Sequence, residues 1–334
     1  MRLGTSLRFL FPTGPHTYEI FKRALAAMPP GAFIERPMGA FDAATQARNL
    51  LDVAAAARAA GLDGLLVGDN HAVPSAFANS FAPIATIARL SAVTGSMPIG
   101  MVLLAPFYEP IVLAEQIGTL AAFADAPLIV VLANGGREDA FKAFGMPIAS
   151  RARRTEELAV VLRALLAGER VTHRGRYLSL DAVQVSPKPR VPVEIWIAGT
   201  VPAAARRAGS LGDAWLTGQN TRDDELVSQL DAYREAAAKA GRPARAVLRR
   251  DIFVAATDAA AHAEVDRILA EGYRGTGKDE LLVGSADAVV ARLAHYRALG
   301  FEEVMVRHIV GDHRSMLASF ALIGERVMGE IRRL

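Results

Sequence analysis

The chain of 334 residues contains no cysteine, which excludes disulfide bonds, thiolate metal sites and a cysteine nucleophile together. It has no His-Glu-x-x-His, EF-hand or phosphate-loop pattern, so the sequence predicts no metal site. No uninterrupted apolar run approaches the roughly 20 residues that a membrane helix requires. The first residues also lack the pattern of a signal peptide. We therefore expect a soluble, cytoplasmic protein without membrane contact.

An excess of charge of one sign is absent as well. The 38 basic and 35 acidic residues leave a formal net charge of +3. Arginines are scattered over the predicted helices and are not clustered with interleaved aromatic residues, so no nucleic-acid-binding surface is indicated. Hydrophobic residues make up 51% of the chain and charged residues 22%, which is typical of a globular protein with a large buried core.

Short apolar segments typical of buried strands alternate with amphipathic helical patterns. The expected strands are 3–9, 64–67, 99–104, 128–133, 193–198, 214–216, 249–256 and 304–307. The expected helices are 43–60, 81–94, 110–124, 151–167, 202–211, 223–240, 259–271 and 287–299. Eight alternations predict an α/β fold, a single (β/α)8 TIM barrel over residues 1–334, with an open doubly wound sheet as the alternative.

Two connections are too long for plain loops and are expected as insertions at the C-terminal face of the barrel, and residues 273–282 form a third expected insert. Residues 11–41 predict a partly helical excursion of the kind that forms lids. Residues 168–192 contain a pattern for a small hairpin, followed by a proline-rich run. Residues 273–282 are preceded by Gly272 and contain two further glycines, and we expect this insert to be mobile.

Several motifs follow one another in a fixed order along the chain. They include Gly61-Leu-Asp-Gly64, Leu103-Leu-Ala-Pro-Phe-Tyr-Glu-Pro110, Ser186-Pro-Lys-Pro189, Ile195-Trp-Ile-Ala-Gly199 and Gly212-Asp-Ala-Trp-Leu-Thr217. In these motifs the chain resembles the bacterial luciferase-like monooxygenase family over about residues 45–220, and more loosely beyond. The resemblance implies a (β/α)8 barrel, in agreement with the strand count.

The resemblance also implies an oxidoreductase or monooxygenase that uses reduced coenzyme F420 or FMN as a dissociable cosubstrate. It implies a small organic substrate, a homo-oligomer and a separate flavin or F420 reductase as a candidate partner. Such a cofactor has a broad apolar ring and an anionic tail, whereas a barrel mouth offers apolar strand ends and backbone amides. We therefore expect the cofactor at the carboxyl ends of the strands.

Asp69, Asn70 and His71 follow the second expected strand and are the catalytic candidates. A carboxylate beside an imidazole can form a proton-transfer pair. The alternative is a capping aspartate and a histidine that only lines a polar wall. In F420-dependent members the imidazole directly follows the acid, and Asn70 occupies that position here.

The candidates for cofactor contact lie at four other strand ends: Leu104, Ala105, Asn134, Gly135, Ala198, Gly199, Thr200 and Thr217. Asn134 and Gly135 can bring an amide and the backbone close to the ring, although Asn-Gly is also an ordinary turn. Thr200 is expected as the N-cap of a helix whose first amides hold the anionic tail, and Gly199 allows a close approach.

Two other functions remain open at this point. A barrel isomerase or hydrolase would bind an anionic substrate at Gly199 and Thr200, and a non-catalytic flavin-binding barrel would be compatible with Asn70 in the imidazole position. Trp196 and Trp215 are expected in the core. His308, after the last strand, is expected near the mouth as an alternative proton-transfer group.

Overall fold

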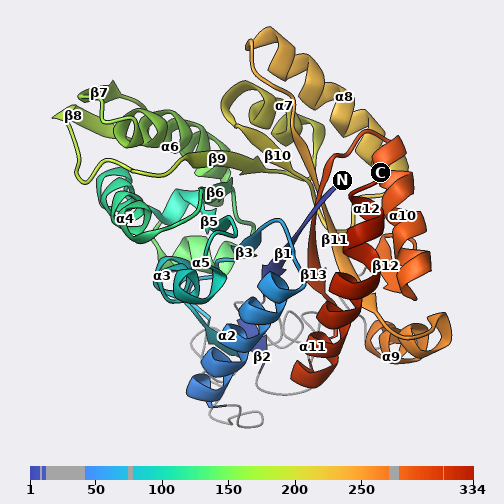
Figure 1. Cartoon of the computed structure of the whole chain (residues 1–334). Coiled ribbons are helices and arrows are strands. Elements are labelled where there is room, and N and C mark those ends of the chain that lie inside the picture. The colour runs from blue at the N-terminus through green and yellow to red at the C-terminus, as the bar shows by residue number, and fades with distance from the viewer. Residues whose placement is uncertain (8–9, 13–41, 74–77, 271–277, 311) are drawn as a thin grey trace.

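A closed parallel barrel forms the centre of the computed structural model, which describes residues 1–7, 10–12, 42–73, 78–270, 278–310 and 312–334 (Figure 1). Eight strands pair side by side in the order β1 (Arg2–Leu7), β3 (Leu65–Val67), β5 (Ile99–Leu104), β6 (Leu128–Ala133), β9 (Val193–Ala198), β10 (Ala214–Leu216), β11 (Ala246–Val254) and β13 (Glu303–His308). Pairing of β13 with β1 closes the ring. The predicted eight-stranded barrel is confirmed, and the open sheet is excluded.

Helices surround this barrel: α2 (Ala43–Ala59), α3 (Pro83–Thr94), α4 (Pro110–Phe123), α6 (Arg151–Leu166), α7 (Pro202–Leu211), α8 (Asp223–Lys239), α9 (Asp258–Ala270) and α10 (Ala286–Ala298). Three of them begin on a proline, whose fixed φ suits the first helical turn and whose missing N–H would be unpaired there anyway. No helix in the described ranges is long and apolar enough to cross a membrane.

Some elements were not expected from the sequence. They are the short helix α5 (Glu138–Ala143), the C-terminal helices α11 (His313–Leu322) and α12 (Met328–Ile331), and the strand β12 (Leu281–Gly284). The expectation that residues 273–282 form a mobile insert is wrong for the last two of them, because Leu281 and Leu282 are buried in β12. This strand forms because β11 continues past the barrel and pairs with it at Asp251–Val254.

The other two insertions are described to different extents. The expected lid at 11–41 lies outside the described residues, apart from residues 11 and 12 in β2 (Leu10–Pro12), which pairs with β4 (Ala78–Ser80). Within 168–192, β7 (Val171–Arg174) and β8 (Ser179–Val183) form an antiparallel hairpin. Glu157 of α6 holds its turn by accepting the backbone N–H groups of residues 176, 177 and 178 at 2.8–3.0 Å.

Alternate residues of each strand face the barrel interior and the helices, which gives two cores. The inner core consists of Leu66, Val102, Ile129, Val131, Trp196, Ala214, Leu216, Val247 and Met305. Trp215 faces outward and packs on Tyr233 of α8, so both tryptophans are core residues as expected. Below Trp196, Arg245 binds Glu194 at 2.6 Å and Glu303 at 3.4 Å at the amino ends of the strands.

A substitution at Gly100 of β5 tests the packing of the inner core. A Cβ atom at this position would lie 2.0 Å from the carbonyl oxygen of Ile129 and 2.6 Å from its Cβ. We expect Gly100→Ala to lower the free energy of unfolding by about 1–3 kcal/mol, because β5 and β6 would be forced apart. Gly329→Ala in α12 is the control, since a Cβ there meets no atom within 4 Å. Equal urea midpoints for both variants would contradict this packing.

Candidate active site

The carboxylate of Asp69, directly after β3, lies at the centre of the site and is fully buried. Its Oδ2 accepts the backbone N–H of Leu104 at 3.0 Å and the hydroxyl of Tyr108 at 2.9 Å, and lies 3.0 Å from Nε2 of His71. The other oxygen, Oδ1, is buried without a hydrogen-bond partner among the described residues. Asp69 therefore joins the ends of β3 and β5 and keeps one acceptor for a further donor.

Tyr108 was not foreseen from the sequence. Burial, together with the negative charge and hydrogen bond of Asp69, raises the pKa of Tyr108 above its usual range, so the phenol stays protonated and donates. The signal was a phenol hydroxyl four residues past the end of the third expected strand, in a motif whose other polar side chain is Glu109.

His71 lies among aromatic rings. The centroid of its ring is 5.5 Å from that of Phe107, 5.7 Å from Tyr108 and 5.5 Å from Phe144, all in edge contacts. Phe107 and Phe144 stack on each other at 4.4 Å. The His71 side chain is 27% exposed, so an imidazole bound to a buried carboxylate remains accessible beside an apolar wall.

Asn70 takes no part in the contact between Asp69 and His71. Its Oδ1 accepts Nη1 of Arg137 at 2.8 Å, and the same nitrogen donates to the carbonyl of His71 at 3.1 Å. Nη2 of Arg137 donates to the carbonyl of Ala72, a non-glycine residue with φ of 51°. In this structure the imidazole that meets the acid is thus His71, and Arg137 ties its loop to the end of β6.

The candidates for ring contact lie on neighbouring strand ends. Leu104 and Ala198 are half-buried at the tips of β5 and β9, whereas Ala105 is fully buried just after β5. Gly135, with φ of 70°, makes the turn after β6, and a Cβ there would lie 3.7 Å from Leu104. These positions form an apolar edge next to Asp69.

A pocket of about 260 Å³ lies between the starts of α6 and α7 and is lined by Asn134, Ala149, Arg151, Ala152, Val201, Ala203, Ala204 and Arg207. The two helix N-termini and Arg151 suit an anion, whereas Arg207 is already paired with Glu156 at 2.8 Å. The N-cap of α7 is Val201, so the expectation for Thr200 is wrong by one residue. A Cβ on Gly199 would lie 2.3 Å from the Cβ of Ala204, so packing of α7 alone already requires this glycine.

Two other expected positions are engaged by the fold itself. The hydroxyl of Thr217 accepts the N–H of Arg249 at 3.0 Å and donates to the carbonyl of Gly218 at 3.2 Å. His308 faces the helices, with Nε2 3.0 Å from Oγ of Ser319, so its expected place at the mouth is wrong. The preceding residue, Arg307, takes the inward position on β13.

Metal ligands do not gather here, since the described part of the chain holds no group of three or more histidines and acidic residues suited to a metal ion. The model of the family described as luciferase-like monooxygenase matches residues 28–280. The chain belongs to the luciferase-like monooxygenase family. Asp69 and His71 thus lie at a strand end of the barrel that this family shares.

Individual relatives agree with this assignment. The chain is 34% identical over 204 residues to an F420-dependent glucose-6-phosphate dehydrogenase of Beutenbergia cavernae, which is 58% of this chain and 60% of that one. Among solved structures, a monooxygenase from Streptomyces bottropensis superposes with a TM-score of 0.78 at 20% identity, covering 98% and 99% of the two chains. An F420-dependent secondary alcohol dehydrogenase gives 0.73 at 18%, with the same coverage. These two structures share the fold.

Replacing Arg137 tests whether it holds the loop of His71. Arg137→Met removes the donors to Asn70 and His71, so we expect faster amide hydrogen exchange in the peptide 68–73. Arg153→Met is the control, because Arg153 is a 76% exposed arginine paired with a neighbour on its own helix. Unchanged exchange in the Arg137 variant would mean that the loop keeps its conformation without this contact.

Proposed function

We propose that this protein is an oxidoreductase that binds F420 at the carboxyl ends of its barrel strands and transfers a hydride between this cofactor and a small organic substrate. The observation that carries the proposal is the contact between buried Asp69 and accessible His71 at a strand end. The names of the curated relatives favour F420, although the chain spans about 60% of the length of the first of them. FMN with dioxygen is the second candidate, because a structural neighbour is an FMN-bound monooxygenase.

The residues present fit such a cofactor. Leu104 and Ala198 offer apolar contact for a ring, and the pocket beside Arg151 offers helix N-termini for an anionic tail. Oδ1 of Asp69 is a buried acceptor that lacks a donor among the described residues, and leaving such a group unpaired costs about 1–3 kcal/mol. When bound, the cofactor supplies the hydride donor or acceptor.

We assign to His71 the transfer of the proton that accompanies the hydride. Oδ2 of Asp69 already accepts hydrogen bonds from two other donors, so it acts as an acceptor toward His71 as well. The proton of the neutral imidazole is then on Nε2, and the contact with Asp69 fixes this tautomer. Nδ1 then carries the lone pair that takes a proton from a substrate hydroxyl. Asp69 thus orients the base, and aromatic rings form an apolar wall beside it.

We propose an uncharged, apolar alcohol or ketone as substrate. Phe107 and Phe144 form an aromatic wall at His71, and Phe144 is 42% exposed. Two arginines near the strand ends are already engaged, Arg137 by Asp139 and Arg307 by both oxygens of Asp251. An apolar molecule is therefore favoured over a sugar phosphate.

The proposal includes three expectations carried over from the sequence. They are a separate reductase, a homo-oligomer and a cytoplasmic location. A cofactor used as a dissociable cosubstrate has to be reduced or oxidised by another enzyme between turnovers, which supports the first.

The cofactor and base assignments can be tested together. Fluorescence titration with oxidised F420 and with FMN should show saturable binding of F420. His71→Ala should lower turnover at least 100-fold, with cofactor affinity within a few-fold of the wild type, because general-base catalysis contributes about 10²–10⁴-fold. Asp69→Asn should lower turnover by a similar factor, because the imidazole then loses its carboxylate partner. His262→Ala, an exposed histidine of α9, is the control. Wild-type turnover in the His71 variant would reject the base, and tighter binding of FMN would favour the second candidate.

The substrate class can be tested with a panel of secondary alcohols of increasing apolar size and with glucose 6-phosphate. We expect kcat/KM to rise with apolar size, and Phe144→Ser to raise KM for the larger alcohols about tenfold by removing apolar contact. Phe123→Ser, at a 79% exposed residue of α4, should leave KM unchanged. A higher kcat/KM for glucose 6-phosphate would contradict the apolar assignment.

A further inference from the structure

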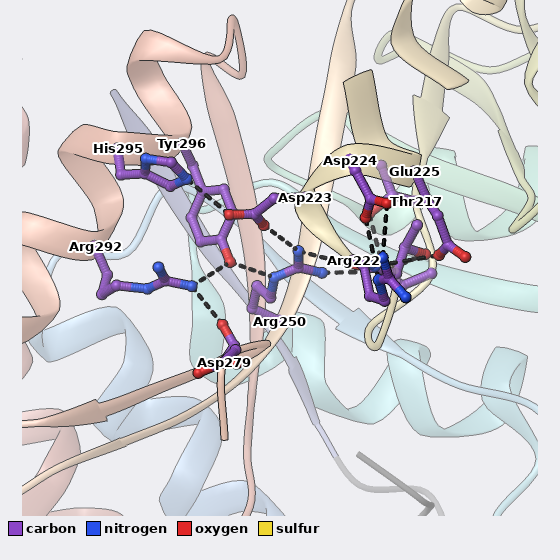
Figure 2. Close-up of polar contacts among 12 residues, drawn as sticks. Thr217, Arg222, Asp223, Asp224, Glu225, Arg250, Asp279, Arg292, His295 and Tyr296 are labelled. Carbon is purple, nitrogen blue, oxygen red and sulfur yellow. Dashed lines mark hydrogen bonds and ion pairs between the residues drawn. The ribbon is translucent and has the colours of Figure 1, made fainter. Parts of the chain in front are cut away.

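Arg250 is a fully buried charge on the outer side of β11, away from the barrel interior. Figure 2 shows its guanidinium beside Tyr296 of α10 and Asp223 at the start of α8. Nε donates to the Tyr296 hydroxyl at 2.9 Å, and Nη2 lies 3.5 Å from a carboxylate oxygen of Asp223. The other oxygen of Asp223 lies 2.7 Å from Nε2 of His295. These neighbours fix Arg250 from two helices.

Nη1 and Nη2 of Arg250 bind carbonyls of the loop that follows β10, and Nη1 also donates to the carbonyl of Arg249 in its own strand at 3.2 Å. Nη2 donates to the carbonyl of Thr221 at 2.9 Å, and Nη1 donates to those of Gln219 at 3.3 Å and Gly218 at 3.5 Å. Three carbonyls of one short loop therefore turn toward the same guanidinium. A planar group with five N–H donors can satisfy such a set, whereas the compact ammonium of a lysine cannot span it.

This arrangement also orients the N–H groups of the loop. In a trans peptide the C=O and the following N–H point in opposite directions. Because the carbonyls of Gly218 and Gln219 face Arg250, the N–H groups of Gln219 and Asn220 face away from it. Neither N–H has an acceptor among the described residues, and Asn220 is exposed.

The same loop supports the neighbouring strand end. A Cβ on Gly218 would lie 2.7 Å from Cγ2 of Thr200, so the loops after β9 and β10 are in close contact. Gln229 of α8 donates to the carbonyl of Thr200 at 3.2 Å. Thr200 directly precedes Val201, which lines the pocket at the start of α7. A shift of the loop 218–221 would therefore move one wall of that pocket.

We propose that Arg250 is a positioning residue for the anionic tail of the cofactor. It binds no ligand itself. It draws the carbonyls of the loop 218–221 toward the helices, which presents the N–H groups of Gln219 and Asn220 on the opposite side and holds Thr200 in place. The proposal rests on the function proposed above, because it assumes a ligand with an anionic tail at the ends of β9 and β10.

The test compares two ligands, oxidised F420 and its deazaflavin ring compound without the anionic tail. Fluorescence titration of Arg250→Met should raise Kd for F420 about tenfold and leave Kd for the tailless compound within twofold. At saturating F420, kcat should stay within twofold of the wild type. Arg250→Lys should restore part of the lost affinity, since the charge is kept while the planar set of donors is lost.

Arg245→Met is the matched control. Arg245 is also ion-paired and precedes β11, but at the amino end of the strand, so this variant should lower the melting temperature without changing Kd for F420. Tyr296→Phe is a milder variant in case Arg250→Met does not fold, because it removes one acceptor of Arg250. We expect it to raise Kd for F420 two- to threefold.

The outcomes separate the two proposals. Wild-type protein that binds neither F420 nor FMN would overturn the proposed function. Wild-type protein that binds F420, together with Arg250 variants of unchanged Kd, would overturn only the positioning role. Equal weakening of both ligands, or equal weakening by Arg245→Met, would also overturn it, since the effect would then be a general loss of structure.

Discussion

The buried carboxylate of Asp69 is the interaction on which the site depends. A charge without contact to water needs hydrogen bonds from the protein, and here Leu104 and Tyr108 donate while Nε2 of His71 lies 3.0 Å away. Leu104 is the last residue of β5 and Tyr108 follows the turn after it, so one side chain joins two neighbouring strand ends. His71 is held at the accessible side of this contact. The imidazole of His71 is thus positioned by its contact with a buried carboxylate, which requires hydrogen-bond donors.

Arginines solve a related problem in the connecting loops. A loop that leaves a buried strand brings carbonyl groups without partners. Arg137, at the start of α5, binds two carbonyls of the loop after β3, and Arg250 of β11 binds carbonyls of the loop after the neighbouring β10. One acts at the mouth beside His71 and the other from the helix layer. Both arginines stabilise the backbone of a loop, and neither is proposed to react with the substrate.

The sequence predicted the family and its fold more completely than it predicted the contacts within the site. The eight strands could be counted because each is an apolar run followed by a helical pattern, and both tryptophans could be assigned to the core. Asn70 and His71 could not be ranked, because spacing along the chain does not tell which side chain turns to Asp69. Tyr108 and Arg137 were missed, since their partners lie 39 and 67 residues away in the chain.

The sequence by itself determined the barrel and the edge at which the polar residues gather, because strand periodicity and strand order are local properties repeated eight times. Tertiary structure decided which of those residues meet. His308 lies at the end of a strand, yet it faces the helices because successive strand residues point to opposite sides. Gly199 was expected to serve a ligand, whereas packing against Ala204 already requires it. Such assignments depend on the direction of a side chain and on neighbours distant in sequence, which only the closed barrel brings together.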